Sequence, residues 1–409
     1  MARRIFDMEH EMFRDSVRAF LANEIKPHRD RWHDQGIVDR WAFEKAGEHG
    51  LLMMWADEQH GGQGLEDFRY EQVFIEEAAR HGDPGFYATL HSRLVGPYIG
   101  KLGTDAQKAR FLPDMAAGRS ILGVAMTEPG AGSDVAGIRS RAEDRGDHWL
   151  LNGSKTYISN GINGDVFVVA ARTVPDKPHG LGLFLVERGM EGFERGRNLK
   201  KMGLKSQDTA ELFFNDVRIP KENVLGDPTR GFYYLMQFLA EERLIGACQY
   251  VAAAEHALEI TLEYVQERKA FGQRIADFQN TRFKLADLRT QIDVAQAFVD
   301  QCVIEHNEGK LTAETAARAK LFTSELEGRV VDECVQLHGG AGYMDEYEIS
   351  RLFVNARISR IYAGSSEIMR EIIARSMGLD PRKRERGDRR DASGGEAPAR
   401  SASRPTGTG

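Results

Sequence analysis

The sequence predicts an α+β protein in which helices come first, a compact β domain follows, and a long helical bundle comes last. Three observations support this order. The hydrophobic period is helical up to about residue 118. Short β-branched and aromatic runs bounded by Gly, Asn, Asp and Pro begin after about residue 121. Long helical stretches without proline return after Gly231. We therefore divide the chain into 1–120, 121–228, 229–379 and 380–409.

The N-terminal part begins with the segment EHEMFRDSVRAFLANEI, whose apolar residues recur at spacings of three to five. That spacing places them near one face of a helix and predicts an amphipathic helix that packs on a core. The residues on the predicted face are Met12, Val17, Phe20, Leu21 and Ile25.

The middle part contains the runs WLLNGSKTYISNG, DVFVVAAR, GLGLFLVER and AELFFNDVRIP, which predict the strands of the β domain. The last part predicts three long helices, at about 231–268, 279–308 and 313–338. Helices of that length that are apolar on more than one side indicate a bundle that also packs against other subunits. From about residue 380 the chain is basic and rich in Gly, Ser, Pro and Ala, so we expect a disordered tail.

The overall composition excludes several classes of protein. The hydrophobic fraction of 41% and the charged fraction of 29% are ordinary for a soluble globular protein, and no run approaches a membrane span. A formal net charge of −7 argues against nucleic acid as a partner. The three cysteines show no CxxC spacing, so we expect neither a disulfide framework nor a metal site.

Two glycine-rich segments of the β domain combine flexible backbone with hydroxyl groups. AMTEPGAGSD at 125–134 carries Thr127 and Ser133, and TYISNG at 156–161 carries Tyr157 and Ser159. Each segment alone is explained by a turn, and neither is a dinucleotide fingerprint, because the third glycine and the βαβ unit are missing. Hydroxyls able to bond a ring edge, with an aromatic ring able to cover its face, favour a planar ligand.

From about residue 5 to 378, the ordered motifs MTEPGAGSD, YISNG, DTAELFFNDVRIP, ERKAFGQ, QLHGGAGY and SSEIMREIIAR resemble those of the acyl-CoA dehydrogenases. These are FAD flavoproteins that desaturate acyl-CoA thioesters between Cα and Cβ. The segments KMGLKSQDTAELFF, GFYYLM and VQLHGGAGYMDEY are most similar to the long-chain branch. The resemblance implies an N-terminal helical domain, a middle antiparallel β domain and a C-terminal four-helix bundle.

The resemblance also implies how FAD is held. One set of residues surrounds the isoalloxazine, with Thr127 and Ser159 bonding its polar edge: Ala125, Met126, Thr127, Gly132, Ser133, Tyr157, Ile158 and Ser159. A second set reaches the FAD of a neighbouring subunit or its adenosine end: Arg268, Phe271, Gln279, Gln336, Leu337, Gly339 and Gly340. Ser365 and Glu367 complete the site. Without the resemblance, Arg268 is a solvated charge, Gly339 a helix stop and Ser365 an N-cap.

The catalytic base presents a puzzle, because the place of Ala363 in RIYAGSSEIMR is commonly held by a glutamate in this family. The long-chain and isovaleryl branches carry that glutamate on a helix of the bundle, just before an arginine. This chain reads FLAEERLIGACQ there, so the resemblance favours Glu242, which precedes Arg243. Glu241 is the competing carboxylate. Adjacent helical residues point about 100° apart, and periodicity alone does not decide between the two.

By resemblance, the base removes the Cα proton while the flavin takes a hydride from Cβ. The thioester carbonyl then accepts hydrogen bonds from the FAD ribityl hydroxyl and from the main-chain N–H of Ala363. Replacing glutamate by alanine there removes the base without removing that donor. The implied substrate contacts are Ser133, Tyr233, Arg243, Ala363 and Gly364.

The resemblance further implies an acyl-CoA substrate, an electron-transfer flavoprotein as electron acceptor and a homotetramer built as a dimer of dimers. We expect a cytoplasmic and bacterial protein. Three other functions stay open: a short branched-chain (isovaleryl-like) dehydrogenase, a flavin oxidase or monooxygenase, and a non-catalytic acyl-CoA or FAD binding module in which Ala363 marks lost chemistry.

Overall fold

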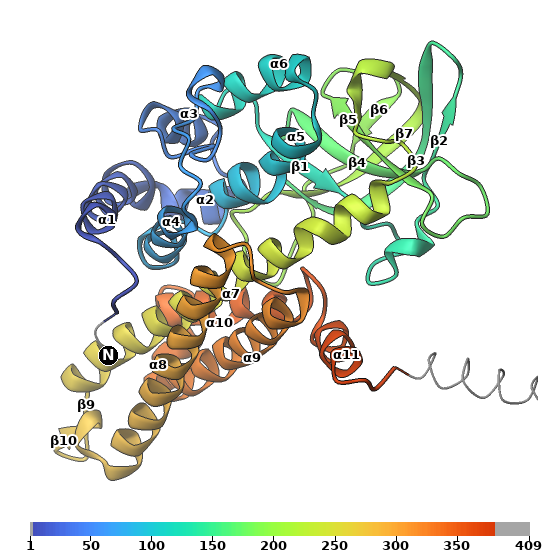
Figure 1. The fold of residues 1–409 in the computed structure, drawn as a ribbon. Coiled ribbons are helices and arrows are strands. Elements are labelled where there is room, and N and C mark those ends of the chain that lie inside the picture. Colours follow the sequence, from blue (N-terminus) through green and yellow to red (C-terminus); the bar gives the residue numbers. More distant parts are fainter. Residues whose placement is uncertain (1–2, 381–409) are drawn as a thin grey trace, which may run out of the picture.

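The computed structural model describes residues 3–380, and its elements form three groups along the chain (Figure 1). The first group is helical and contains α1 (Met8–Phe20), α2 (Arg29–Gln35), α3 (Trp41–Glu48), α4 (Phe68–His81), α5 (Gly96–Leu102) and α6 (Asp105–Ala116). Two π-helical stretches, Leu21–Ile25 and Leu90–Val95, extend α1 and precede α5. The tail predicted from residue 380 onward lies, apart from its first residue, outside the described residues.

The second group is a single sheet in the order β6-β7-β3-β2-β4-β5-β8, with β1 beside β4. Its strands are β1 (Leu122–Ala125), β2 (Arg141–Asp144), β3 (His148–Ser159), β4 (Val166–Arg172), β5 (Leu181–Glu187), β6 (Phe193–Arg195), β7 (Thr209–Pro220) and β8 (Val224–Leu225). Most neighbours are antiparallel, as predicted, but β1 and β2 both run parallel to β4. The middle domain is therefore a mixed sheet.

Strand β4 explains why its sequence is apolar without alternation. Val166, Val168 and Ala170 face a core shared with the N-terminal helices and the start of α7 (Gly231–Glu267). Phe167, Val169 and Ala171 face a second core made by the other strands. A strand covered on both faces needs apolar side chains at successive positions. The sheet is thereby fixed against the helices that border the candidate site.

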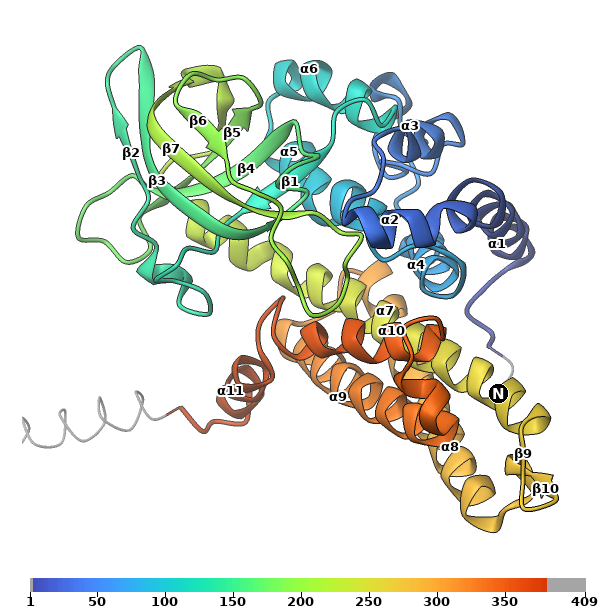
Figure 2. The same cartoon turned by 180° about the vertical axis from the view of Figure 1, so that it is seen from behind.

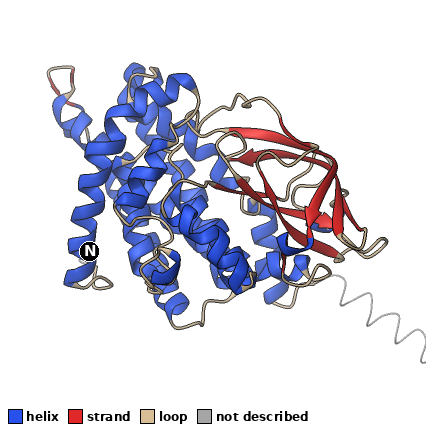
Figure 3. Cartoon of the chain, turned by 90° about the horizontal axis from the view of Figure 1, so that it is seen from above, coloured by secondary structure: helices blue, strands red, loops and turns tan. Residues whose placement is uncertain are grey.

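The third group contains α7, α8 (Gln279–Asn307), α9 (Ala313–His338), α10 (Glu348–Ala356) and α11 (Ser366–Ser376), with a small hairpin of β9 (Lys269–Ala270) and β10 (Gln273–Arg274). The three long helices match the predicted stretches to within about one residue at each end. Helix α7 has 37 residues, which corresponds to a length of about 55 Å at 1.5 Å per residue. It runs from the sheet to the hairpin at the far end of the bundle (Figure 2), and Figure 3 shows the strands of the sheet gathered on one side of the molecule with most of the helices on the other. Among the described residues, no helix is long and apolar enough to cross a lipid bilayer.

The first helix differs from the prediction at one residue. Val17, Phe20, Leu21 and Ile25 are buried as predicted, but Met12 is 66% exposed. The buried positions in the first turns of α1 are occupied by His10 and Arg14 instead. Apolar spacing alone did not reveal that part of this helix face packs by ion pairing.

Arg14 belongs to a buried ion network between α1 and α4. Its Nη1 donates to Glu76 Oε2 and Glu77 Oε1, each at 3.0 Å, and Arg18 Nε donates to Glu77 Oε2 at 3.0 Å. Arg3 extends the network, since its Nη2 lies 2.8 Å from Glu76 Oε1 and 2.6 Å from Asp300 Oδ1 of α8. Burial tends to raise the pKa of Glu77, but Arg18 and Arg14 hold it below the ordinary value. The network joins three helices that are far apart in the sequence.

We expect Glu77→Gln to lower the free energy of unfolding by about 3 kcal/mol at pH 7, because the buried Glu77 loses the carboxylate that pairs with Arg14 and Arg18. A carboxylate whose pKa is lowered by folding stabilises the protein above its unfolded pKa, so the difference from wild type shrinks as the pH falls below about 4.5. Denaturant unfolding between pH 3 and 8 measures both effects. Glu9→Gln, on the exposed side of α1, is the control. Equal destabilisation at pH 3 and pH 7 would contradict this account.

Candidate active site

The candidate site lies where α7 passes between the N-terminal helices and the sheet, and Glu242 is its central acidic group. Glu242 is 6% exposed, and its Oε1 accepts a hydrogen bond from the Tyr98 hydroxyl of α5 at 3.2 Å. Burial raises the pKa of Glu242 to about 7, outweighing the Tyr98 hydrogen bond and the positive charge of Arg243. A carboxyl with that pKa exchanges protons readily near neutral pH.

The neighbouring Glu241 has the opposite electrostatic environment. Its carboxylate lies 2.6 Å from Arg93 Nε and 3.0 Å from His306 Nε2, with Lys101 Nζ at 3.8 Å. Burial favours a higher pKa for Glu241, but His306, Arg93 and Lys101 together lower it to about 2. Glu241 is therefore a charged carboxylate at neutral pH, held by Arg93, Lys101 and His306. The structure separates two adjacent glutamates that periodicity could not separate.

The turn that carries Ala363 follows Tyr362, which is hydrogen-bonded to Tyr87, and the charge of Glu242 acts on the same Tyr87. Lys320 anchors the turn. Ala363 and Gly364 have φ values of 52° and 91°, a left-handed conformation that alanine adopts only at some cost. Lys320 of α9 is buried, and its Nζ donates to the Gly364 carbonyl at 2.7 Å. Within the described residues, the N–H of Ala363 donates to no other group. The turn thus presents a fixed backbone donor.

The first glycine-rich loop is anchored by a buried ion pair. Lys155 of β3 is fully buried, and its Nζ donates to Glu128 Oε1 at 2.8 Å and to the Met126 carbonyl at 3.0 Å. Glu128 also accepts from the N–H groups of Arg139 and Ser140. The N–H of Thr156 donates to the Thr127 carbonyl at 2.9 Å, so the two glycine-rich segments are bonded to each other.

The residues predicted to surround the flavin ring lie on these two segments. Ala125 ends β1, and Tyr157, Ile158 and Ser159 end β3. Tyr157 is 71% exposed and has a φ of 60°, so its ring is not fixed by packing in this chain. Thr127 and Ser159 are half-buried, and Gly132 and Ser133 are exposed. The segments leave an aromatic ring and several hydroxyls available to a ligand.

The second predicted set lies elsewhere, at the far end of the bundle (Figure 1). Arg268 follows α7, Phe271 lies in the β9–β10 turn, and Gln279 begins α8. The C-terminal end of α9 lies at the same end of the bundle, because the hydroxyl of Tyr264, near the end of α7, donates to the carbonyl of His338, the last residue of α9, at 3.1 Å. The exposed members of this set are Arg268, Phe271, Gln279, Gln336, Gly339 and Gly340; Leu337 is half-buried. Since α7 separates the two sets by most of its length, one chain does not bring them together.

The remaining predicted residues occupy three different environments. Arg243 is buried beside Glu242, whereas Tyr233 is 54% exposed in the first turn of α7. Ser365 caps α11, where its Oγ accepts from the N–H of Ile368 at 3.4 Å, and Glu367 is exposed in the same turn. Gly339 ends α9 with a φ of 60°. In the single chain, Ser365 is therefore an N-cap and Gly339 a helix stop, which are the roles expected without a bound cofactor.

Sequence reasoning missed the groups that fix the site: Tyr98, Arg93, Glu128, Lys155 and Lys320. The sequence did mark Glu128, a charged residue inside the glycine-rich segment 125–134, and Lys155, which directly precedes the segment 156–161. The others contact the site from helices remote in sequence, and no local pattern marks them.

Comparisons with known proteins identify the family to which the chain is similar. The chain matches the models for the acyl-CoA dehydrogenase N-terminal domain at residues 7–119, the middle domain at 123–217 and the C-terminal domain at 229–378. It is 49% identical over 382 residues to the long-chain specific acyl-CoA dehydrogenase of Sus scrofa mitochondria, covering 92% of this chain and 88% of that protein.

Two solved structures extend the comparison. An acyl-CoA dehydrogenase from Geobacillus kaustophilus superposes with a TM-score of 0.90 at 45% identity, covering 92% of this chain and all of that one. A glutaryl-CoA dehydrogenase from Mycobacterium smegmatis, in complex with FADH2, gives a TM-score of 0.85 at 29% identity, covering 91% and 95% of the two chains.

We expect the Glu242 carboxyl to titrate with a midpoint near pH 7. The infrared band of a protonated carboxyl, isolated by subtracting the spectrum of Glu242→Gln, should disappear as the pH rises through that value. Removing a neighbouring negative charge favours ionisation, so Glu241→Gln should lower the midpoint. A wild-type midpoint at or below 4.5 would contradict the assigned environment.

Proposed function

This chain belongs to the acyl-CoA dehydrogenase family, and on that premise we propose that Glu242 is the base that removes the Cα proton of the substrate. The enzyme is an FAD-dependent oxidoreductase that desaturates acyl-CoA thioesters. One observation carries the assignment of the base. Glu242 is a buried carboxyl with a pKa near 7, whereas the carboxylate of Glu241 is paired with Arg93, Lys101 and His306.

The proposed reaction divides the work between Glu242 and the Ala363 turn. Glu242 takes the Cα proton, and the electron pair of that C–H bond forms the new double bond as the Cβ hydrogen leaves with its own pair. The N–H of Ala363 donates to the thioester oxygen, where negative charge develops as the proton leaves. Lys320 holds the carbonyl of the next residue and so keeps the donor in place. Arg243 and Tyr233, with Ser133 and Gly364, are the proposed substrate contacts.

The residues present fit FAD. Gly130 and Gly132 have no heavy atom within 4 Å of an added Cβ, so the loop leaves open space. The exposed Tyr157 ring is suited to cover a planar heterocycle, and Thr127 and Ser159 offer hydroxyls to its edge. Bound FAD supplies the acceptor for the hydride that leaves Cβ. The chain's own contribution is a loop fixed by Lys155 and Glu128, which sets the position of these groups before the substrate arrives.

A second copy of the chain is needed to complete the proposed cofactor site. Arg268, Phe271, Gln279 and the 336–340 segment lie at the opposite end of α7 from the flavin loops. Phe271 is 96% exposed, which suits a residue that another subunit covers. We therefore propose a homotetramer, a dimer of dimers in which each bundle end reaches a neighbour's FAD. An electron-transfer flavoprotein is the proposed electron acceptor.

The proposed substrates are long straight-chain acyl-CoAs, because the Sus scrofa relative is long-chain specific. Anaerobic loss of flavin absorbance on mixing with saturated acyl-CoAs of graded length, including a branched one, tests this directly. The fastest loss is expected with long straight chains. The fastest loss with a short branched chain would favour the isovaleryl-like alternative, and rapid oxidation of the reduced flavin by oxygen would favour an oxidase.

Substituting Glu242 and Glu241 separately tests which of the two glutamates removes the Cα proton. Glu242→Gln should slow anaerobic flavin reduction by about 10²- to 10⁴-fold, because general base catalysis contributes that much. Glu241→Gln should reduce flavin within about tenfold of the wild-type rate and shift the pH dependence to lower pH. In wild type the rate should rise with pH through about 7, as Glu242 becomes ionised. Near-normal reduction by Glu242→Gln would show that another group is the base.

The anchoring pair provides a separate prediction. Lys155→Met leaves Glu128 buried without its counter-ion and should free the loop that contacts the flavin. We expect FAD affinity to fall at least tenfold, measured by the free FAD that passes an ultrafiltration membrane. Lys177→Met, an exposed lysine of the same domain, is the control. Unchanged FAD retention in Lys155→Met would mean that the loop does not depend on this pair.

A further inference from the structure

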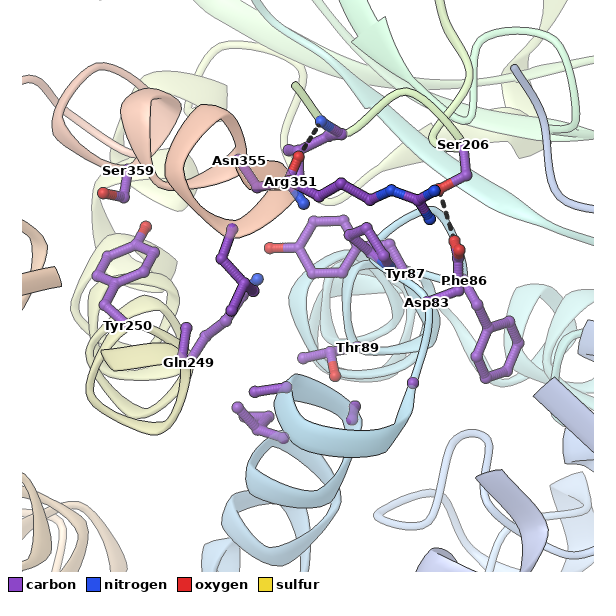
Figure 4. Close-up of a pocket in the computed structure, with 18 of the residues that line it drawn as sticks. Asp83, Phe86, Tyr87, Thr89, Ser206, Gln249, Tyr250, Arg351, Asn355 and Ser359 are labelled. Atoms are coloured by element: carbon purple, nitrogen blue, oxygen red, sulfur yellow. Dashed lines mark hydrogen bonds between the residues drawn. The ribbon is translucent and has the colours of Figure 1, made fainter. Parts of the chain in front are cut away.

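A cavity of about 120 Å³ lies between the N-terminal helices, α7, α9 and α10 (Figure 4). Tyr87 lines the cavity and lies close enough to Glu242 for the carboxylate charge, together with burial, to raise the tyrosine pKa to about 12. Tyr362 also lines it and directly precedes the Ala363 turn. If the proposed function is correct, the acyl chain leaves the catalytic turn toward this cavity.

The wall of the cavity nearest that turn is unusually polar for an alkyl chain. Tyr250 of α7 and Tyr362 have ring centroids 6.2 Å apart, and Tyr87 lies against Tyr362. The Tyr250 hydroxyl covers Gly246, where it is 2.8 Å from the position of an added Cβ. In Figure 4 this hydroxyl points toward Ser359, which lies at the same end of the cavity. Pockets for apolar ligands normally carry few polar groups, and these fix the ligand's orientation.

Glu327 of α9 contributes a buried carboxyl group to this wall. It is 7% exposed and in hydrogen-bond contact with Ser359, and burial raises its pKa to about 8 against the charges of Arg360 and Lys320. The side chain is therefore largely neutral at pH 7 and has one proton to donate. The hydroxyl of Ser359 donates to the Ala356 carbonyl at 2.7 Å, so its oxygen is available to receive that proton.

This arrangement leaves one oxygen of Glu327 without a partner. Oε2 is buried and has no hydrogen-bond partner within the described residues. A buried acceptor is normally satisfied, and an unsubstituted alkyl chain lying against it brings no donor. The geometry therefore favours an occupant that carries a donor of its own.

We propose that this cavity receives the acyl chain of a hydroxylated acyl-CoA, and that the substrate hydroxyl donates a hydrogen bond to Oε2 of Glu327. The proposal rests on the proposed function of the catalytic site. A carboxylate on the chain has no proton to donate, and an ammonium group would face the charges of Lys320 and Arg360. A hydroxyl is neutral, donates once, and can also accept from the tyrosine hydroxyls around it.

The test compares FAD-loaded wild type with Glu327 variants in anaerobic flavin reduction. The substrates are straight-chain acyl-CoAs of one length, either unsubstituted or carrying one hydroxyl at successive carbons from C4 to the terminal carbon. We expect at least one hydroxylated substrate to exceed the unsubstituted one about fivefold or more in kcat/KM, mostly through KM. Glu327→Leu should abolish that preference and improve the unsubstituted chain. Glu327→Gln, which keeps an acceptor oxygen, should retain most of the preference.

Asp332→Asn, an exposed acidic residue on the same helix, is the matched control and should behave as wild type. If Glu327→Leu does not fold, Glu327→Met replaces it as the variant without an acceptor oxygen. The wild-type substrate series alone also tests whether a substrate hydroxyl raises kcat/KM. A wild-type protein that oxidises unsubstituted chains but gains nothing from a hydroxyl at any position overturns this inference alone and assigns Oε2 to a water molecule. Absence of flavin reduction by every acyl-CoA overturns the proposed function, and the inference with it.

Discussion

The candidate site depends on the burial of Glu242 without a salt bridge in the described part of the chain. A lone buried carboxyl is costly to ionise, and its pKa rises until proton transfer near neutral pH becomes feasible. The same helix turn also buries Glu241, whose charge is balanced by Arg93, His306 and Lys101. This partition places Arg93, His306 and Lys101 around Glu241 and leaves Glu242, the proposed base, with Tyr98 and the adjacent Arg243. Had Arg93 reached Glu242 instead, the pKa of Glu242 would fall and its basicity would be lost.

With the proposed base on α7, the Ala363 turn has a single proposed task. The turn presents a backbone N–H, and Lys320 anchors it through the neighbouring carbonyl. The cofactor loops are anchored in the same manner, by the buried Lys155–Glu128 pair. In each case a buried lysine donates to a main-chain carbonyl of the proposed site, although the two lysines lie in different parts of the chain. The site is thus positioned by charges that do not themselves contact the reacting atoms.

Much of this was predictable from sequence, for identifiable physical reasons. The three long helices were found to within about a residue because each keeps its apolar period without a proline. Glu242 was favoured through its motif, although its separation from Glu241 required the partners on α5, α8 and the Leu90–Val95 segment. Met12 was placed wrongly because the buried face of α1 is partly ionic. Tyr98, Lys320 and Glu327 could not be found, since each acts across elements far apart in the chain. The division into domains, the assembly and the role of the tail stay predictions.

The most direct test of Glu242 separates proton removal from hydride transfer. An acyl-CoA in which sulfur replaces Cβ retains acidic Cα protons but has no Cβ hydrogen to give up. Incubated with the FAD-loaded enzyme in D2O, it should exchange its Cα protons, seen as a mass increase, with wild type and with Glu241→Gln. The account predicts that Glu242→Gln binds this compound and exchanges its protons at least about a hundredfold more slowly. Exchange at the wild-type rate by Glu242→Gln would contradict it.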